Sequence, residues 1–206
     1  MSRFLLIFDL DGTLVDSAPD LRAALNQMLR ERGGSPLSLP QVRHMIGDGV
    51  QALVARALTA SNADPAAAAG ALPRFLEIYE ADATALTRPY PAVPATLTAL
   101  RRRGYRTAIC TNKPQRATIA VLEGLGLLAL FDGIAGGDRF PVRKPDPGHL
   151  VGLIYELGGR VDLAAMIGDS ENDAAAAHAA GLPIVLMRYG YARGAPESLT
   201  PDALLD

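Results

Sequence analysis

The sequence predicts an α/β fold, in which a parallel sheet is flanked by helices and a helical insertion follows the first strand. Short apolar runs of strand length alternate with helical segments along most of the chain. Most of these runs are apolar throughout, which is typical of strands buried on both faces of a parallel sheet. About 70 residues of helical pattern, with no strand between them, follow the first run and indicate an insertion.

The alternating part of the chain supplies the expected sheet and its covering helices. The expected strands are residues 4–8, 105–110, 132–135, 164–167 and 183–187. The expected helices are residues 92–103, 114–125, 147–157 and 172–180, and a glycine stands just past the end of each. Strands that alternate with helices in this way form a Rossmann-like, doubly wound parallel sheet with right-handed crossovers.

The insertion begins with an amphipathic helix at residues 19–32. Further helices are expected at residues 39–46, 49–60 and 65–86. Pro89 and Pro91 then mark the return of the chain to the sheet. We therefore expect an α/β core formed by residues 1–15 and 89–206, and a helical cap domain formed by residues 16–88.

Composition excludes several classes of protein. The 206 residues carry a formal net charge of −2, so there is no basic excess for nucleic acid or for an anionic membrane surface. The absence of Trp and the low aromatic content, 5%, argue against stacking platforms for bases. No apolar stretch approaches the roughly 20 residues that span a bilayer. The single cysteine favours a reducing, cytoplasmic location. We expect no nucleic-acid or membrane partner, and either a monomer or a homodimer.

Acidic and hydroxyl residues follow the expected strands where each strand ends. The segments are Asp9-Leu10-Asp11-Gly12-Thr13 after the first strand, Thr111-Asn112-Lys113 after the second, and Gly168-Asp169-Ser170-Glu171-Asn172-Asp173 after the fourth. Lys144 stands in a loop that prolines on either side of Asp146 hold in place. Ligands of doubly wound sheets bind beyond the carboxyl ends of the strands. We therefore expect carboxylates, a hydroxyl and an ammonium group to gather at one edge of the sheet.

This combination of side chains predicts phosphoryl transfer. Carboxylates that converge repel one another unless a cation lies between them. Mg²⁺ prefers oxygen ligands and commonly shares its site with a substrate phosphate. A carboxylate can also attack phosphorus and form an aspartyl-phosphate, after which catalysis is mainly alignment and neutralisation of the phosphoryl oxygens. The expected partner is a small phosphorylated metabolite, and the expected cofactor is Mg²⁺.

The motifs also resemble those of a known family. The segment Asp9-Leu10-Asp11-Gly12-Thr13-Leu14-Val15-Asp16-Ser17 resembles the first motif of the haloacid dehalogenase superfamily of phosphohydrolases. Thr111-Asn112, Lys144 and the pair Asp169 and Asp173 match the second, third and fourth motifs, in order and at strand ends. The resemblance covers nearly the whole chain, and the helical insertion is similar to the cap of that superfamily.

The resemblance implies a catalytic role for four residues. Asp9 is expected to be the nucleophile that attacks phosphorus. Asp11 is expected to protonate the leaving oxygen and then to activate water. Thr111 is expected to hydrogen-bond a phosphoryl oxygen. Lys144 is expected to neutralise the nucleophile and the phosphoryl group in transfer.

The resemblance also implies a metal site and a substrate site. The residues expected at the metal are Asp9, the backbone carbonyl of Asp11, Asp169 and, as support for the metal or its waters, Asp173. The residues expected to bind substrate are Gly12, Thr13 and Asn112. Gly12 is expected to permit the tight turn that brings backbone N–H groups near phosphate.

Within the superfamily, the sequence is more similar to the phosphoglycolate phosphatases. Their substrate-facing loop resembles the segment Arg43-His44-Met45-Ile46-Gly47-Asp48-Gly49. Arg43 is therefore a candidate bidentate donor to a substrate carboxylate. The resemblance implies 2-phosphoglycolate as substrate and a cap that opens and closes over it.

Other interpretations stay open at this point. The same site suits a sugar phosphate, a nucleotide or pyrophosphate, and the cap decides among them. A carbon–halogen hydrolase needs neither the acid at Asp11 nor a metal, so Asp11 and Asp169 together count against it. A phosphomutase retains its phosphoryl group, and a non-catalytic binding protein is free to lose motif residues, none of which is missing here. Thr111 can alternatively be a simple helix cap, and Arg43 can alternatively be a residue on the surface of the cap.

Overall fold

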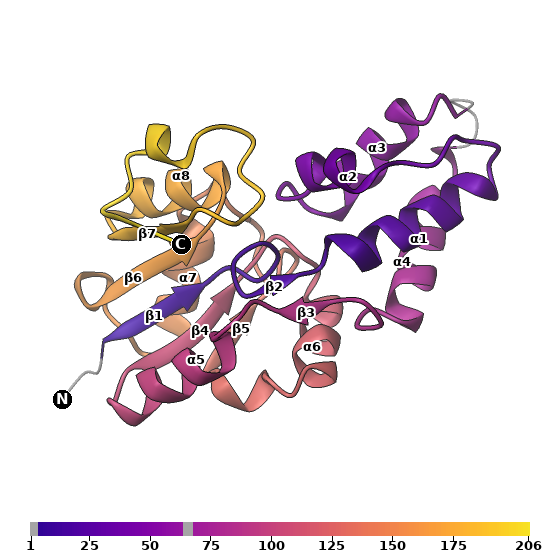
Figure 1. The fold of residues 1–206 in the computed structure, drawn as a ribbon. Coiled ribbons are helices and arrows are strands. Elements are labelled where there is room, and N and C mark those ends of the chain that lie inside the picture. Colours follow the sequence, from indigo (N-terminus) through magenta and orange to yellow (C-terminus); the bar gives the residue numbers. More distant parts are fainter. Residues whose placement is uncertain (1–3, 64–67) are drawn as a thin grey trace.

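The computed structural model describes residues 4–63 and 68–206. Figure 1 shows an α/β part that holds the sheet, beside a helical part. Within the described residues, the main sheet has six strands in the order β5-β4-β1-β6-β7-β8, and all neighbours are parallel. The strands are β1 (Leu5–Phe8), β4 (Arg106–Cys110), β5 (Gly133–Ala135), β6 (Ala164–Gly168), β7 (Ile184–Met187) and β8 (Ala203–Leu205). The predicted fold class is confirmed.

Strand β1 lies at the centre of the sheet, between β4 and β6, and is buried on both faces. Leu5 and Ile7 pack into the core on one face, and Phe8 packs into the core on the other. The Phe8 face is covered by α5 (Val93–Arg102) and α6 (Gln115–Gly124), and the opposite face by α7 (Gly148–Glu156) and α8 (Glu171–Ala180) (Figure 1). The continuous apolar pattern of the strand follows from this double burial.

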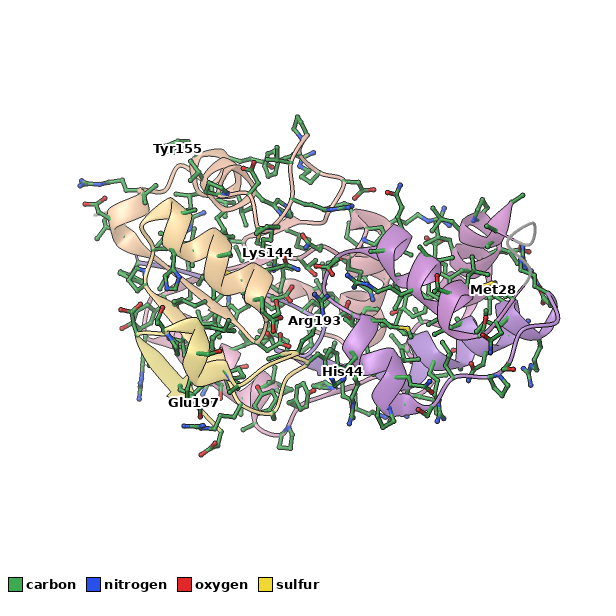
Figure 2. All side chains as sticks on the ribbon, turned by 90° about the horizontal axis from the view of Figure 1, so that it is seen from above. Met28, His44, Lys144, Tyr155, Arg193 and Glu197 are labelled. Carbon is green, nitrogen blue, oxygen red and sulfur yellow. The ribbon has the colours of Figure 1, made fainter. Side chains whose placement is uncertain are left out.

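The helical part follows the first strand, as predicted. It consists of α1 (Ala18–Arg30), α2 (Leu39–Met45), α3 (Val50–Ala60) and α4 (Ala71–Ala81). Helix α1 packs against the other three, and its buried Leu25, Met28 and Leu29 share one apolar core with Phe75 of α4. Figure 2 shows Met28 inside this part. None of the described helices is long and apolar enough to cross a membrane.

The helix expected at residues 65–86 is shorter in the structure. Residues 64–67 lie outside the described residues, and α4 ends at Ala81. The buried Asp20 accounts for the early end, because its carboxylate accepts hydrogen bonds from the backbone N–H groups of Leu86 and Thr87 and from the Thr87 hydroxyl. Residues 82–86 form turns and bends, and these bonds hold Leu86 and Thr87 against Asp20 of α1, where the helix does not continue.

Two short strands that the sequence did not predict connect the helical part to the sheet. Strand β2 (Val15–Asp16) leaves the α/β part, and β3 (Arg88–Pro89) returns to it. They pair antiparallel, with Val15 opposite Pro89. Two-residue strands have no periodicity to detect, and their pairing joins segments more than 70 residues apart.

The last strand, β8, is also an addition to the prediction. It pairs parallel to β7, with Val185 opposite Ala203, and forms one edge of the sheet. Its three residues stand between Asp202 and Asp206, and Leu205 is exposed. A short strand with one exposed face carries little of the apolar signal that identifies the buried strands.

Candidate active site

The first turn after β1 places two acidic residues at the carboxyl end of the sheet. The N–H of Asp9 donates to the carbonyl of Ile167, near the end of β6, at 2.9 Å. This bond fixes the backbone of Asp9 beside the neighbouring strand. The chain then turns tightly at Gly12, whose φ of +89° disfavours other residues. A Cβ added at Gly12 would overlap the carboxylate of Asp169, so this position requires glycine on two grounds.

Three buried carboxylates converge at this edge. One oxygen each of Asp9, Asp169 and Asp173 lies within 4.8 Å of the others. Burial, with smaller contributions from neighbouring carboxylates, raises the pKa of Asp9 to about 6, although Lys144 opposes the shift. Burial and the charges of Asp173 and Asp9 likewise raise the pKa of Asp169. The arrangement is unfavourable for three negative charges and favourable for a cation among them.

Lys144 is the cation that the protein itself brings to this cluster. Its Nζ lies 3.0 Å from Oδ1 of Asp9 and 2.6 Å from Oδ1 of Asp173, and it donates to the carbonyl of Cys110 at 2.6 Å. Burial opposes the charge, but the carboxylates of Asp173 and Asp9 outweigh burial and raise the pKa of Lys144. Lys144 therefore stays charged beside Asp9. Figure 2 shows it near the boundary between the α/β part and the helical part.

Both carboxylate oxygens of Asp173 have partners within the protein. Its Oδ2 accepts from the backbone N–H groups of Asp169 and Ser170 at 3.1 and 3.0 Å, and from the Ser170 hydroxyl at 2.7 Å. Asp173 and Ser170 also form a capping box at the start of α8. With Oδ1 bonded to Lys144, both oxygens are engaged, so Asp173 positions the loop and the lysine around it.

Thr13 and a backbone group fix the orientation of Asp169. The Thr13 hydroxyl donates to Oδ1 of Asp169 at 2.6 Å, and the N–H of Tyr191 donates to Oδ2 at 2.6 Å. Thr13, which was predicted to bind substrate, is thus placed as a positioning partner of a carboxylate in the cluster.

Asp11 points away from the carboxylate cluster and toward Lys113. Nζ of Lys113 lies 3.1 and 3.2 Å from the two oxygens of Asp11 and 4.6 Å from the centre of the Tyr79 ring on α4. Lys113 is 7% exposed, and Asp11 and Tyr79 outweigh burial and raise the pKa of its ammonium. The sequence placed Lys113 in a motif segment but gave it no role. The available signal was that the chain has only two lysines, of which Lys144 is the other.

A small cavity of about 50 Å³ lies between the sheet edge and the helical part. Its wall on the sheet side includes Asp9, Asp11, Thr111, Asn112 and Lys113. Its wall on the other side is mainly apolar and includes Leu21, Ile46, Val50, Leu53, Phe75, Leu76 and Tyr79. Asp9 and Asp11 therefore face a small, partly open cavity between the two parts of the molecule.

Asn112 connects three loops around the cavity. Its Nδ2 donates to the carbonyls of Gly47 and Lys144 at 2.9 and 2.8 Å. The amide therefore holds the Lys144 loop against the loop between α2 and α3. Thr111 is buried beside it, and its Oγ1 accepts from the N–H of Lys113 at 3.3 Å.

The structure does not bring Arg43 into the cavity. Its guanidinium donates to Oδ2 of Asp16 at 2.9 Å and lies 5.9 Å from the centre of the Tyr191 ring. The Tyr191 hydroxyl donates to the other oxygen of Asp16 at 2.5 Å. Helix α2 thus directs Arg43 toward the β2–β3 connection, where it pairs with Asp16, and its substrate role stays a prediction.

The loop between α2 and α3 is bonded to the α/β part by residues that the sequence did not single out. The carbonyl of Gly47 accepts from Asn172, and Asp48 accepts from Asn172 and from Arg193. Arg193 also donates to the carbonyl of His44, and Figure 2 shows the two residues at the boundary of the two parts. Although partial burial opposes it, the hydrogen bonds from Asn172, Arg56 and Arg193 lower the pKa of Asp48 to about 2. The loop is therefore tied to the α/β part beside the cavity.

Comparison with known proteins identifies the family. A model of the haloacid dehalogenase-like hydrolases matches residues 5–181. A phosphoglycolate phosphatase of Rhodospirillum rubrum is 46% identical over 98% of this chain and 86% of that protein. One from Cereibacter sphaeroides is 48% identical over 93% of this chain and 87% of that protein. A crystal structure of a predicted phosphoglycolate phosphatase from Haemophilus somnus is 32% identical, with a TM-score of 0.95, over 100% of this chain and 95% of that one. The chain belongs to the haloacid dehalogenase-like hydrolases.

Proposed function

We propose that this protein is a Mg²⁺-dependent phosphomonoester hydrolase that forms an aspartyl-phosphate on Asp9, and that its substrate is 2-phosphoglycolate. The observation that carries the proposal is the position of Asp9, which is buried among two carboxylates and an ammonium group and also lines the cavity. Relatives that are 46% and 48% identical are phosphoglycolate phosphatases, which supports the choice of substrate.

The residues present fit a magnesium ion. Within the described chain, Oδ1 of Asp9 is buried and accepts no hydrogen bond, and its contact with Lys144 is an ion pair, so it keeps lone pairs that a metal ion can bind. Carboxylate and carbonyl oxygens are the ligands that Mg²⁺ prefers. Asp9, Asp169 and the backbone carbonyl of Asp11 are the proposed ligands, and Asp173 supports them. When bound, the ion neutralises negative charge on the carboxylates and on the phosphoryl oxygens.

The residues around Asp9 can perform both halves of the reaction. In the first, the carboxylate of Asp9 attacks phosphorus, the bond from phosphorus to the leaving oxygen breaks, and Asp11 gives its proton to that oxygen. Lys144 and the hydroxyl of Thr111 neutralise and align the phosphoryl oxygens. In the second, Asp11 takes a proton from water, the water oxygen attacks the phosphorus of the aspartyl-phosphate, and inorganic phosphate leaves Asp9.

The helical part has a function in this scheme. We assign residues 16–88 to a cap domain over an α/β core formed by residues 1–15 and 89–206. The apolar wall that α3 and α4 contribute to the cavity supports this division, because it excludes water from a reactive intermediate. The buried, unpaired Cys110 is compatible with work in a reducing compartment such as the cytoplasm.

Phosphate release tests the proposal. Purified protein is incubated with 2-phosphoglycolate, a sugar phosphate, a nucleotide and pyrophosphate, with Mg²⁺ or with EDTA. We expect fastest release from 2-phosphoglycolate, and only with Mg²⁺. An Asp9→Asn variant that releases phosphate as fast as the wild type would refute the mechanism. Faster release from another compound would refute only the choice of substrate. A phosphorylated protein that persists without hydrolysis would instead indicate a phosphomutase.

A further inference from the structure

Lys113 has a position that the general chemistry of phosphoryl transfer does not explain. The phosphoryl group belongs beside Asp9, where Lys144 already supplies an ammonium group. Lys113 lies on the other side, at Asp11, where the leaving oxygen of the substrate is expected. Among the described residues that line the cavity, Lys113 is the one with a positive charge.

The wall opposite Lys113 offers no charge to a substrate. On the side of the helical part, the described lining consists of apolar and aromatic side chains together with the backbone of Gly47 and Gly49. Arg43, the cation predicted from the sequence, is held by Asp16 outside the lining. An anionic group that entered this space would meet one cation among the lining side chains, and a buried charge without a partner is strongly disfavoured.

From this geometry we propose that Lys113 is a specificity-determining residue, which binds a carboxylate on the leaving group of the substrate. The inference rests on the proposed phosphatase activity and names the group that recognises the substrate. Nζ of Lys113 is 3.1 Å from an oxygen of Asp11, so a leaving oxygen that Asp11 protonates is close to the ammonium. In 2-phosphoglycolate, one methylene carbon separates that oxygen from the carboxylate carbon, so a leaving oxygen at Asp11 brings the carboxylate close to the ammonium of Lys113.

A second explanation is that Lys113 serves only to hold Asp11. Asp11 is its one carboxylate partner among the described ion pairs, so removing Lys113 affects Asp11 in either case. The two explanations differ in their dependence on the substrate. A residue that acts through Asp11 affects every phosphomonoester, whereas a carboxylate ligand affects only substrates that carry a carboxylate.

Steady-state kinetics on two matched compounds separates these explanations. We compare 2-phosphoglycolate with ethyl phosphate, which has the same chain length and no carboxylate, in the presence of Mg²⁺. The Lys113→Gln variant should lose about 10- to 100-fold of the preference in kcat/KM for 2-phosphoglycolate, mainly through a higher KM. Lys113→Arg, which keeps the charge, should retain part of the preference. An equal loss on both compounds, or no loss, would overturn the proposal.

Two other cations serve as controls. Arg116 is an exposed residue on α6 that pairs with Glu80, and Arg116→Gln makes the same change of charge away from the cavity. It should leave the preference unchanged. Arg143 is an exposed residue that approaches Gly49 at the edge of the cavity, and is thus the rival source of positive charge. If Arg143→Gln removes the preference and Lys113→Gln does not, the proposal is wrong.

A measurement on the wild-type protein covers the case in which the variants fail to fold. The chain has two lysines, so protein labelled with ¹³C at lysine Cε should give two resonances. With Mg²⁺ present, glycolate should shift one resonance and inorganic phosphate the other. If glycolate shifts neither, the carboxylate site is refuted. Wild-type protein that hydrolyses neither phosphomonoester would refute the proposed function, and the response to glycolate would then decide the carboxylate site by itself.

Discussion

A substitution at Gly12, matched by one at Gly104, tests whether the first turn is shaped around Asp169. Both glycines have a φ of +89°, so alanine has the same backbone strain at each position, about 1–2 kcal/mol. A Cβ at Gly104 meets nothing within 4 Å, whereas a Cβ at Gly12 overlaps the carboxylate of Asp169 and the ring of Tyr191. The difference between the two variants therefore reports the contacts with Asp169 and Tyr191.

The magnitude of that difference follows from the bonds that Asp169 must give up. Its carboxylate accepts from the Thr13 hydroxyl and from the N–H of Tyr191, both at 2.6 Å. A hydrogen bond to a charged group contributes about 1.5–3 kcal/mol, so loss of both should cost Gly12→Ala about 3–6 kcal/mol more than Gly104→Ala. For a chain of this length, that corresponds to a melting temperature about 6–24 °C lower.

Two assays check the expectation. Urea denaturation gives the free energy of unfolding of each variant without metal, and calorimetric titration gives the affinity for Mg²⁺. Gly104→Ala should bind Mg²⁺ like the wild type, and Gly12→Ala should bind it at least about tenfold more weakly because a proposed ligand is displaced. Equal stability and equal affinity in the two variants would show that Asp169 moves freely and that the turn is not shaped around it.

The remaining predictions concern the carboxylate cluster and the loop between α2 and α3. Asp173→Asn removes a buried partner of the Lys144 ammonium and should lower the free energy of unfolding by about 3–5 kcal/mol. Adding Lys144→Met to this variant should recover part of the lost stability. If the losses of the two single variants simply add in the double variant, the two residues do not stabilise each other as a pair. Because the pKa of Asp9 rises from 3.8 to about 6 on folding, the folded protein binds more protons than the unfolded one between these values, so stability in EDTA should fall by up to about 3 kcal/mol as pH rises through this window. Asp9→Asn should remove that fall and Mg²⁺ should reduce it, and pH curves of wild type and variant that run parallel in EDTA would contradict the assignment. Arg193→Ala removes bonds to the loop between α2 and α3 and should raise KM by about two- to fivefold with a small change in kcat, while the matched change at the exposed Arg160 should alter neither constant.

The sequence was sufficient for the parts of the site that depend on short stretches of chain. Asp9 directly follows β1, Asp169 directly follows β6, and Asp173 lies in the first turn of α8. Once the sheet is parallel, the carboxyl ends of its strands meet, and the convergence of these residues follows. The expected cluster could therefore be predicted without knowledge of any distance.

Side chains on the helical part were less predictable, because their direction depends on packing between distant segments. Arg43 lies in the segment that the sequence identified as facing the substrate, yet the structure pairs it with Asp16, 27 residues earlier. Asn172 and Arg193 contact the same loop from the α/β part, across 124 and 145 residues. No local pattern encodes contacts of this kind, since a solvent-facing residue and an interface residue have the same composition and periodicity.

The charges of the site explain why it holds lysines in a chain that otherwise uses arginine. Of the 20 basic residues, two are lysines, and both are buried here. Lys144 reaches Asp9, Asp173 and the carbonyl of Cys110 from one point, which a compact ammonium can do and a planar guanidinium with donors in a fork cannot. The four carboxylates of Asp9, Asp11, Asp169 and Asp173 exceed the two ammonium groups by two negative charges, which is the charge of one divalent cation. The ion can thus balance the cluster at Asp9, and the ammonium of Lys113 is left to alternate between Asp11 in the empty site and an anionic leaving group in the filled one.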